Sequence, residues 1–207
     1  MYVFKGVIAG AAFAQGHRFV MGVWHESPAG PIADVMWAKP DGSRTLLAST
    51  EWAADFVSHH YHFDDVSATE LLSEVDDGSL RIKGGDIHLH LSLGPPGVAS
   101  RLLQLRPKWL QRRPAWITLE NGLLRPLAVP LVFGGGKGIK LRGRTRVGAR
   151  QWYGIQDYRP VLNGGATVAG ADLGALGAAL NPAAFGFSEF PKKASALWVT
   201  SLIEETG

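Results

Sequence analysis

Apolar and polar residues alternate along this chain in short runs that end at glycine or proline, a pattern typical of β-strands joined by turns. An apolar run of about twelve residues near the N-terminus breaks at Gly16-His17, and RFVMGVW follows at 18–24. These two runs predict a hairpin. A second hairpin is predicted from 32–39 and 43–49, because the intervening Pro40-Asp41-Gly42 has a turn mechanism.

The same signals predict further strands in the rest of the chain. These strands are expected at residues 79–83, 86–93, 139–147, 150–155, 160–170 and 195–205. Residues 115–124 read as a hairpin around Asn121-Gly122, and 125–138 read as a long loop. Two segments stay open, because 62–72 fits a strand or a helix and 171–180 fits a short helix or a loop.

Helices are expected at two places. Thr50 has the side chain of an N-cap residue, and the apolar spacing after Glu51 predicts two to three helical turns. Residues 98–107 are leucine-rich and basic, and they predict a helix that ends before Pro107. Many short strands with few helices predict a mostly β fold, formed as one domain over 1–207: an antiparallel β-barrel or barrel-like sandwich with two or three short helices.

Cysteine is absent from the 207 residues, which excludes disulfides, thiolate metal sites and a cysteine nucleophile. The apolar N-terminal run has the length of a secretory h-region, but only Lys5 precedes it and polar residues follow it. We therefore interpret this run as a buried strand of a cytoplasmic protein without a membrane span.

Positive charge is concentrated in residues 101–150, which contain 12 basic residues and 1 acidic residue. Strand alternation places Lys140, Arg142, Arg144 and Arg146 on one face, which must meet water or a wet cavity. Three interpretations compete. The row belongs to a solvated edge strand, contributes with the amides of 134–138 to a pocket for a small anion, or contacts nucleic acid, for which no RNP, KH or zinc-finger pattern is present.

Histidines form two candidate sites. His59 and His62 are three residues apart near the end of the first predicted helix, and His88 and His90 share one face of a predicted strand. Either pair could begin a metal site, or His88 and His90 could serve an enzyme as general bases oriented by Asp34, Asp64 or Asp86. The alternative is that the histidines simply face water, and no cofactor is predicted.

The favoured function is the binding of a small, largely apolar molecule with an anionic end inside the barrel. The expected contacts fall into two groups. Aromatic walls would come from Trp24, Trp37, Trp152 and Tyr158, and the anion would meet Arg142, Arg144 or Arg150. An enzyme that uses the histidine pair is the alternative, and nucleic-acid binding through 101–150 is a second one. The sequence does not determine the oligomeric state, and a homodimer is compatible with it.

Two short segments resemble known families. The strand count and the aromatic, glycine-rich composition are similar to lipocalin-like barrels, whose early G-x-W element is matched by Gly22-Val23-Trp24. Residues 190–194, FPKKA, resemble the G-F-P-K-K segment of acetoacetate decarboxylases. Here Ser188 and Glu189 interrupt that segment and no later lysine follows to form a Schiff base, so neither resemblance assigns a functional residue.

Overall fold

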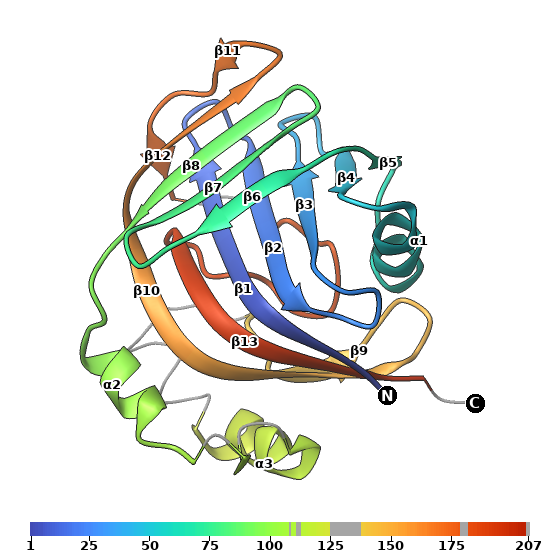
Figure 1. Cartoon of the computed structure of the whole chain (residues 1–207), viewed down its shortest axis with the longest axis vertical. Coiled ribbons are helices and arrows are strands. Elements are labelled where there is room, and N and C mark those ends of the chain that lie inside the picture. Colours follow the sequence, from blue (N-terminus) through green and yellow to red (C-terminus); the bar gives the residue numbers. More distant parts are fainter. Residues whose placement is uncertain (108, 111–112, 125–137, 179–181, 206–207) are drawn as a thin grey trace.

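The computed structural model describes residues 1–107, 109–110, 113–124, 138–178 and 182–205. Ten strands follow one another in one curled sheet, in the order β5-β4-β3-β2-β1-β13-β10-β8-β7-β6 (Figure 1). Their bounds are β1 (Tyr2–Phe13), β2 (Arg18–Glu26), β3 (Ile32–Ala38), β4 (Arg44–Ala48), β5 (Asp65–Ala68), β6 (Leu72–Val75), β7 (Ser79–Gly84), β8 (Ile87–Leu93), β10 (Arg150–Val168) and β13 (Ser195–Glu204). All neighbours are antiparallel except the parallel pair β4 and β5.

The remaining elements are short. Strands β9 (Arg142–Arg144), β11 (Ala171–Asp172) and β12 (Leu176–Gly177) pair at the margins of the sheet. The helices are α1 (Glu51–His60), α2 (Val98–Gln104) and α3 (Pro114–Leu119), and a π-helical turn, Glu120–Leu124, follows α3. The predicted fold class is confirmed, since the chain is mostly β and its sheet curls into a half-barrel with three helices (Figure 1).

The long strand β10 produces the curl. Its first half, 150–160, pairs with β13, and its second half, 161–168, pairs with β8. Register shifts occur in both halves, and such irregularities bend a strand and increase its twist. The sequence predicted two separate strands here, and the structure shows one bent strand. The bend carries β8, β7 and β6 across one face of β1, β2 and β3 (Figure 1).

Side chains fill the space inside this curl. On one side alternate residues of β1, β2 and β3 point inward, and on the other side alternate residues of β7 and β8 meet them. The buried members include Val7, Ala9, Phe13, Phe19, Met21, Val35, Leu80, Ile82, Leu89 and Leu91. The centre of the half-barrel is therefore a packed core, as in other small barrels, and a ligand must find space elsewhere.

Helix α1 begins where the sequence predicts. The Thr50 side chain accepts a hydrogen bond from the backbone N–H of Ala53 at 3.1 Å, as an N-cap residue does. The inward-facing residues of α1 pack against Phe4 and Ile32 of the sheet. At the other end, the Arg146 guanidinium donates to the carbonyls of Ser58 and His59, which lack partners within the helix.

Two local predictions are wrong. Residues 115–124 do not form a hairpin, because Pro114 starts α3 at a position that favours proline and Ile117 is buried against the sheet. Asn121, expected in a tight turn, instead accepts a hydrogen bond from the backbone N–H of Leu141. Of the strand predicted at 139–147, only Arg142–Arg144 pairs, with β10.

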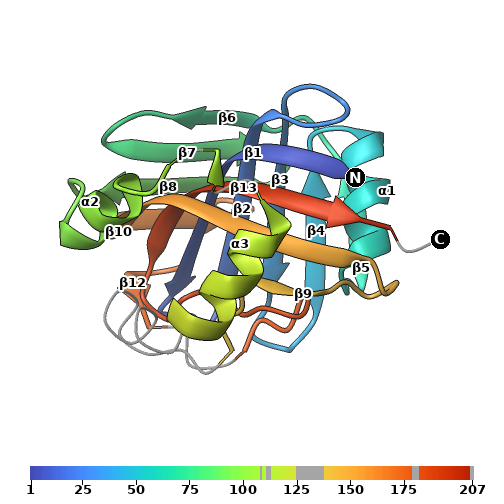
Figure 2. The ribbon, with the colours of Figure 1, turned by 90° about the horizontal axis from the view of Figure 1, so that it is seen from below.

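Helices α2 and α3 lie at one end of the molecule, on the outside of the sheet (Figures 1 and 2). Ser100 of α2 donates a hydrogen bond to Asp157, and Trp152 of β10 donates to Thr118 of α3 at 3.1 Å. These contacts fix both helices to β10. Within the described part of the chain, no helix is long and apolar enough to cross a bilayer.

The packed centre predicts a large cost for truncating Leu91, which is fully buried between the two layers. We expect Leu91→Ala to lower the free energy of unfolding by about 2–5 kcal/mol, measured by urea denaturation. The matched control is Leu162→Ala on β10, where the side chain is 67% exposed and the change should be within about 0.5 kcal/mol. A loss of similar size in both variants would contradict the packed centre.

Candidate ligand-binding site

A pocket lies on the face of the sheet opposite the packed centre. Alternate residues of β1, β2, β3, β10 and β13 form its floor, and its cavity volume is about 130 Å³. Its walls are mostly apolar. They include Phe4, Ile8, Val20, Trp24, Ile32, Met36, Ile155, Leu197, Val199 and Ile203 from the sheet and Phe56, Val57 and Tyr61 from α1 and its C-cap. The pocket is therefore an apolar space built on rigid strands, as small-molecule sites are.

Residues 182–191 form a segment that closes part of the pocket. Glu189 organises this segment, because its carboxylate accepts hydrogen bonds from the backbone N–H groups of Ala183 and Ala184. The same carboxylate pairs with Arg18 at 2.9 Å, and Arg18 also donates to the carbonyl of Phe190 at 2.7 Å. The ring of Phe190 lies so close to Gly10 that a Cβ there would overlap it. The hydrogen bonds of Glu189, its ion pair with Arg18 and the close packing of Phe190 on Gly10 together hold this segment against the floor of the pocket.

Asp34 is the buried carboxyl group of the pocket. It lies in the middle of β3, is 2% exposed and accepts a hydrogen bond from the Trp24 indole N–H at 2.8 Å. Removal from water disfavours the ionised form, so burial raises the pKa of Asp34 from 3.8 to about 7, although the Trp24 hydrogen bond opposes this increase. Near neutral pH, Asp34 can therefore both hold and release a proton.

Gly22 makes the contact between Asp34 and Trp24 possible. Gly22 lies directly opposite Asp34 across β2 and β3. A Cβ at Gly22 would lie 2.4 Å from Asp34 Oδ1 and 2.5 Å from Trp24 Nε1. The hydrogen bond between carboxyl and indole therefore occupies the space that any other residue at position 22 would fill.

Two tyrosines and a glutamine form the second polar group of the pocket. The hydroxyls of Tyr61 and Tyr153 lie 2.8 Å apart, and the Gln151 side-chain N–H₂ donates to the Tyr61 hydroxyl at 2.6 Å. Gln151 also donates to the Ser201 hydroxyl at 3.2 Å. Burial raises the pKa of Tyr61 to about 12 and that of Tyr153 well above its usual value, so both hydroxyls keep their protons.

The site can hold a polar group of a ligand between a carboxyl and two hydroxyls. The negative charge of Asp34 contributes to raising the pKa of both Tyr61 and Tyr153, so the three groups share one electrostatic environment. A buried carboxyl can accept a proton or a hydrogen bond, and a tyrosine hydroxyl can donate one to an oxygen. The arrangement suits an apolar molecule with a hydroxyl, carbonyl or amine at one end.

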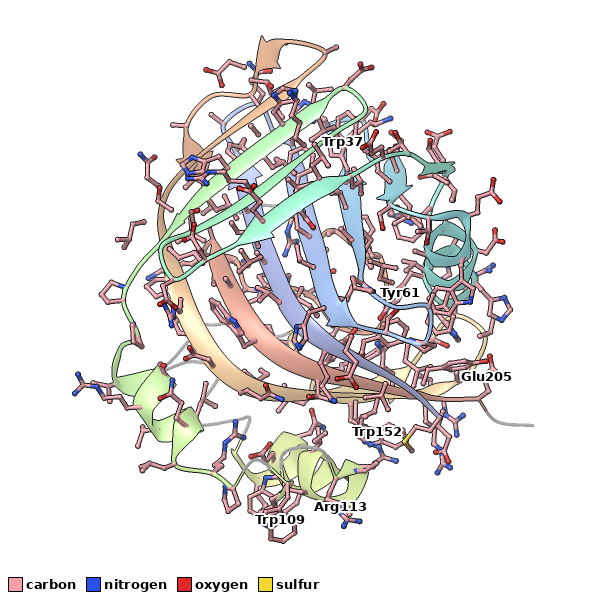
Figure 3. All side chains as sticks on the ribbon, viewed as in Figure 1. Trp37, Tyr61, Trp109, Arg113, Trp152 and Glu205 are labelled. Carbon is pink, nitrogen blue, oxygen red and sulfur yellow. The ribbon has the colours of Figure 1, made fainter. Side chains whose placement is uncertain are left out.

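Of the four aromatic residues predicted to wall one cavity, Trp24 and Tyr158 pack on one apolar cluster, while Trp37 and Trp152 belong to two others. Trp24 lines the pocket. Trp37 packs on the other face of the sheet, where its indole N–H donates to His17 Nδ1 at 2.9 Å. Trp152 is buried beneath α3, far from Trp37 (Figure 3), and Tyr158 packs beside α2 in the cluster of Ile139, Ile155, Leu197 and Val199.

The predicted anion-binding arginines lie on the surface. Arg142 is exposed, Arg144 donates to the carbonyl of Gly148, and Arg150 pairs with Glu204 at 2.7 Å. Lys140 and Arg146, the other members of the predicted row, are exposed as well, although Lys140 also lies at the edge of the pocket. The row therefore faces solvent, and residues 134–137 of the predicted anion loop lie outside the described residues.

The histidine candidates are also exposed. His88 and His90 project from the outer face of β8, while Ile87, Leu89 and Leu91 face the core. His59 and His62 are exposed at the end of α1. Within the described residues, no group of three or more His, Asp or Glu side chains is placed to hold a metal ion.

The sequence reasoning missed the main polar residues of the pocket. It considered Asp34 only as a partner for histidine, and it assigned none of Tyr61, Gln151 and Tyr153 to a ligand pocket. One signal was present, because Asp34 interrupts the apolar run of β3 at a position that alternation assigns to a buried face. The tyrosine pair had no such signal, since its members come from segments 92 residues apart.

Comparisons with known proteins add little. No family model matches the chain, and no curated protein matches its sequence. A solved structure described as "Structural Studies of Acetoacetate Decarboxylase" is similar, with a TM-score of 0.48 and 8% sequence identity over 98% of this chain and 86% of that one. This similarity assigns no role to any residue here. Lys192 and Lys193 of the segment that resembles that family are exposed.

The raised pKa of Asp34 predicts how stability depends on pH. A carboxyl that binds its proton more tightly when folded stabilises the protein fully below pH 3.8 and loses this contribution as the pH rises to about 7. Relative to Asp34→Asn, the wild-type free energy of unfolding should therefore fall by about 4 kcal/mol between pH 4 and pH 8. Urea denaturation at a series of pH values measures this difference.

Trp24→Phe is the control for this assignment. It removes the hydrogen bond that lowers the pKa of Asp34, so the titration of the Asp34 carboxyl, followed by carbon NMR, should move to higher pH.

The burial of His60 lowers its pKa and adds a separate loss of stability below pH 6.5, which the wild type and the Asp34→Asn variant share and which cancels in their difference. A pH-independent difference would show that Asp34 is not buried.

Proposed function

We propose that the protein binds a small, largely apolar molecule in this pocket, with the polar end of the molecule at Asp34, Tyr61 and Tyr153. The observation that carries the proposal is a carboxyl group, 2% exposed, within an apolar cavity on a rigid sheet. Burial of a carboxyl group costs free energy and therefore opposes folding. The stability of the fold alone does not explain a carboxyl at this position. Groups whose pKa is strongly shifted by burial are concentrated at functional sites.

The cavity volume limits the size of the molecule. At about 130 Å³ the cavity is slightly smaller than an engineered cavity of about 150 Å³ that binds benzene. A molecule with about six to ten non-hydrogen atoms fits such a space. We therefore expect a short aliphatic or monocyclic molecule, and not a long-chain fatty acid that lies entirely inside.

The charges around the pocket favour a neutral or cationic polar end over an anionic one. Among the described lining residues, Asp34 and Glu189 are acidic and the basic residue is Lys140, which is exposed. The arginines expected to bind an anion, Arg142, Arg144 and Arg150, do not line the pocket. A buried carboxylate next to an anionic group costs free energy, because like charges at close range repel strongly in an apolar space.

Three six-carbon amphiphiles test the proposal: hexanol, hexylamine and hexanoate. At pH 8, where Asp34 is largely ionised, we expect hexanol and hexylamine to bind at least about tenfold more tightly than hexanoate, measured by calorimetric titration. Asp34→Asn should abolish most of this preference, because it removes the negative charge. Tightest binding of hexanoate to the wild-type protein would contradict the proposed polar end.

A second variant pair tests the location of the site. Val199→Phe places a larger side chain at a pocket-lining position that is 2% exposed, and it should weaken hexanol binding by at least about tenfold. Leu162→Phe makes the same kind of change at an exposed position and should leave binding unchanged. Melting temperatures of both variants show whether the fold is retained, and equal binding by both would place the ligand elsewhere.

A second candidate function is catalysis of proton transfer by Asp34. The favouring observation is that the pKa of Asp34, about 7, suits a general base that works near neutral pH. In this scheme the carboxylate takes a proton from the carbon next to a carbonyl, and one hydroxyl of the hydrogen-bonded Tyr61–Tyr153 pair donates a hydrogen bond to the oxygen that gains charge.

Exchange of deuterium from solvent distinguishes catalysis from binding alone. Under the second candidate function, 2-hexanone in heavy water should exchange the hydrogens next to its carbonyl faster with wild-type protein than with Asp34→Asn, followed by proton NMR. Leu162→Ala serves as the control with an intact pocket. Equal exchange rates for the wild type and Asp34→Asn, with 2-hexanone bound by both, would leave ligand binding as the function of the pocket.

A further inference from the structure

A separate feature of the molecule lies outside the pocket, on α2, on α3 and at Leu105 and Trp109 between them. Eleven large hydrophobic residues are exposed in the described part of the chain, and six of them fall within one segment of the sequence. These six are Val98, Leu102, Leu105, Trp109, Leu119 and Leu123, and we call them, with Arg101 and Arg113, the 98–123 surface. Single exposed hydrophobic residues are ordinary, but such a concentration indicates an interaction site.

The exposed residues of α2 and its C-terminus form one stripe. Val98, Leu102 and Leu105 are spaced at i, i+4 and i+7, so they lie on the same side of the helix. The opposite side is fixed to the protein, because Ser100 donates a hydrogen bond to β10 and Leu103 packs on the apolar cluster next to the pocket. The helix is therefore anchored on one side, and its apolar stripe points away.

The segment after α2 continues this arrangement. Leu119 and Leu123 are spaced at i and i+4, while Ile117 is buried against Trp152 and Leu202 of the sheet. Trp109 is 65% exposed, and Figure 3 shows Trp109 and Arg113 together at the end of the molecule that is farthest from β6–β8. Both helices lie on the outside of the sheet (Figure 2), and both carry exposed apolar side chains.

Positive charge surrounds these apolar side chains. Residues 98–124 contain five basic residues and one acidic residue. The acidic residue, Glu120, is buried and pairs with Arg106, so its charge is not presented outward. Arg101 and Arg113 are exposed beside the leucines. A partner of this surface must therefore be anionic and must also accept apolar side chains.

We propose that the 98–123 surface binds the protein to membranes that contain anionic phospholipids. Leucine and valine side chains enter the boundary between headgroups and acyl chains, Trp109 lies at the headgroup level, and Arg101 and Arg113 contact the phosphates. Nucleic acid offers the same negative charge but no apolar layer. Aliphatic side chains such as Leu102 and Leu105 gain little from a phosphate backbone, so the lipid surface is the better match.

Sedimentation of the full chain with vesicles tests this proposal. The vesicles contain phosphatidylcholine with phosphatidylserine, or phosphatidylcholine alone. We expect binding to the mixed vesicles that is at least about tenfold stronger than to the neutral ones and that weakens as salt is added. The emission of Trp109, obtained as the difference between wild type and Trp109→Phe, should move to shorter wavelength when vesicles are present.

Two sets of variants separate the proposed contacts from general effects. Leu102→Ala with Leu105→Ala should reduce the partition coefficient at least about tenfold, and Arg101→Gln with Arg113→Gln should reduce the preference for phosphatidylserine. The matched control is Leu72→Ala with Leu162→Ala, two leucines with 61% and 67% exposure that lie outside this surface. All of these positions are exposed, so the variants should fold, and their melting temperatures verify it.

Each outcome decides the proposal. Loss of vesicle binding in the 98–123 variants together with normal binding in the control supports it. If the protein stays in the supernatant with both kinds of vesicle, the proposal is overturned. This holds also if sedimentation equilibrium shows that a second copy of the chain covers the surface. The proposal is also overturned if all variants bind vesicles as the wild type does. It is overturned as well if the 98–123 surface binds single-stranded DNA at physiological salt but does not bind vesicles.

Discussion

The structure depends on the fact that its central strands are apolar on both faces. In β1, β2, β3 and β13 nearly every position is buried or half-buried, so neither face of the sheet can be left in water. The bend of β10 covers one face by folding β6–β8 over it, and that face fills completely. On the other face, α1 and residues 182–191 cover the sheet only in part, and the pocket is the space that remains between them and the strands.

The chemistry of the pocket follows from the same constraint. Asp34 lies on the face that α1 and residues 182–191 cover, so its carboxyl is removed from water without a cationic partner among the described pocket residues. Its hydrogen bond from Trp24 only partly offsets the loss of hydration, and its pKa therefore reaches about 7. The hydroxyls of Tyr61 and Tyr153 keep their protons for the same reason. Burial therefore leaves the pocket with a carboxyl that can accept a proton and with a tyrosine pair that can donate a hydrogen bond.

Local sequence signals predicted most of the elements but not how they meet, and they failed at 115–124 and over most of 139–147. The turn at Pro40-Asp41-Gly42, the Thr50 cap and the alternation of His88 and His90 with leucines each depend on neighbours within a few residues, and each agrees with the structure. Which face becomes the core depends on the bend of β10, and nothing in its sequence distinguishes one bent strand from two. Trp24, Trp37 and Trp152 were therefore assigned to one cavity, although they lie in three separate clusters.

The basic stretch of the chain divides into two parts with different physical roles. Lys140, Arg142, Arg144 and Arg146 are exposed in a stretch, 138–150, where the exposed large hydrophobic residue is Val147; there the cations contribute hydration and, at Arg146, a helix cap. Arg101 and Arg113 are exposed next to leucines and Trp109, where the same charge accompanies a large apolar area. Charge alone does not separate these surfaces, but the apolar side chains do. Leu103 of α2 also packs on the apolar cluster that contains Ile139 and Ile155, two residues that line the pocket, so α2 connects the 98–123 surface with the pocket wall.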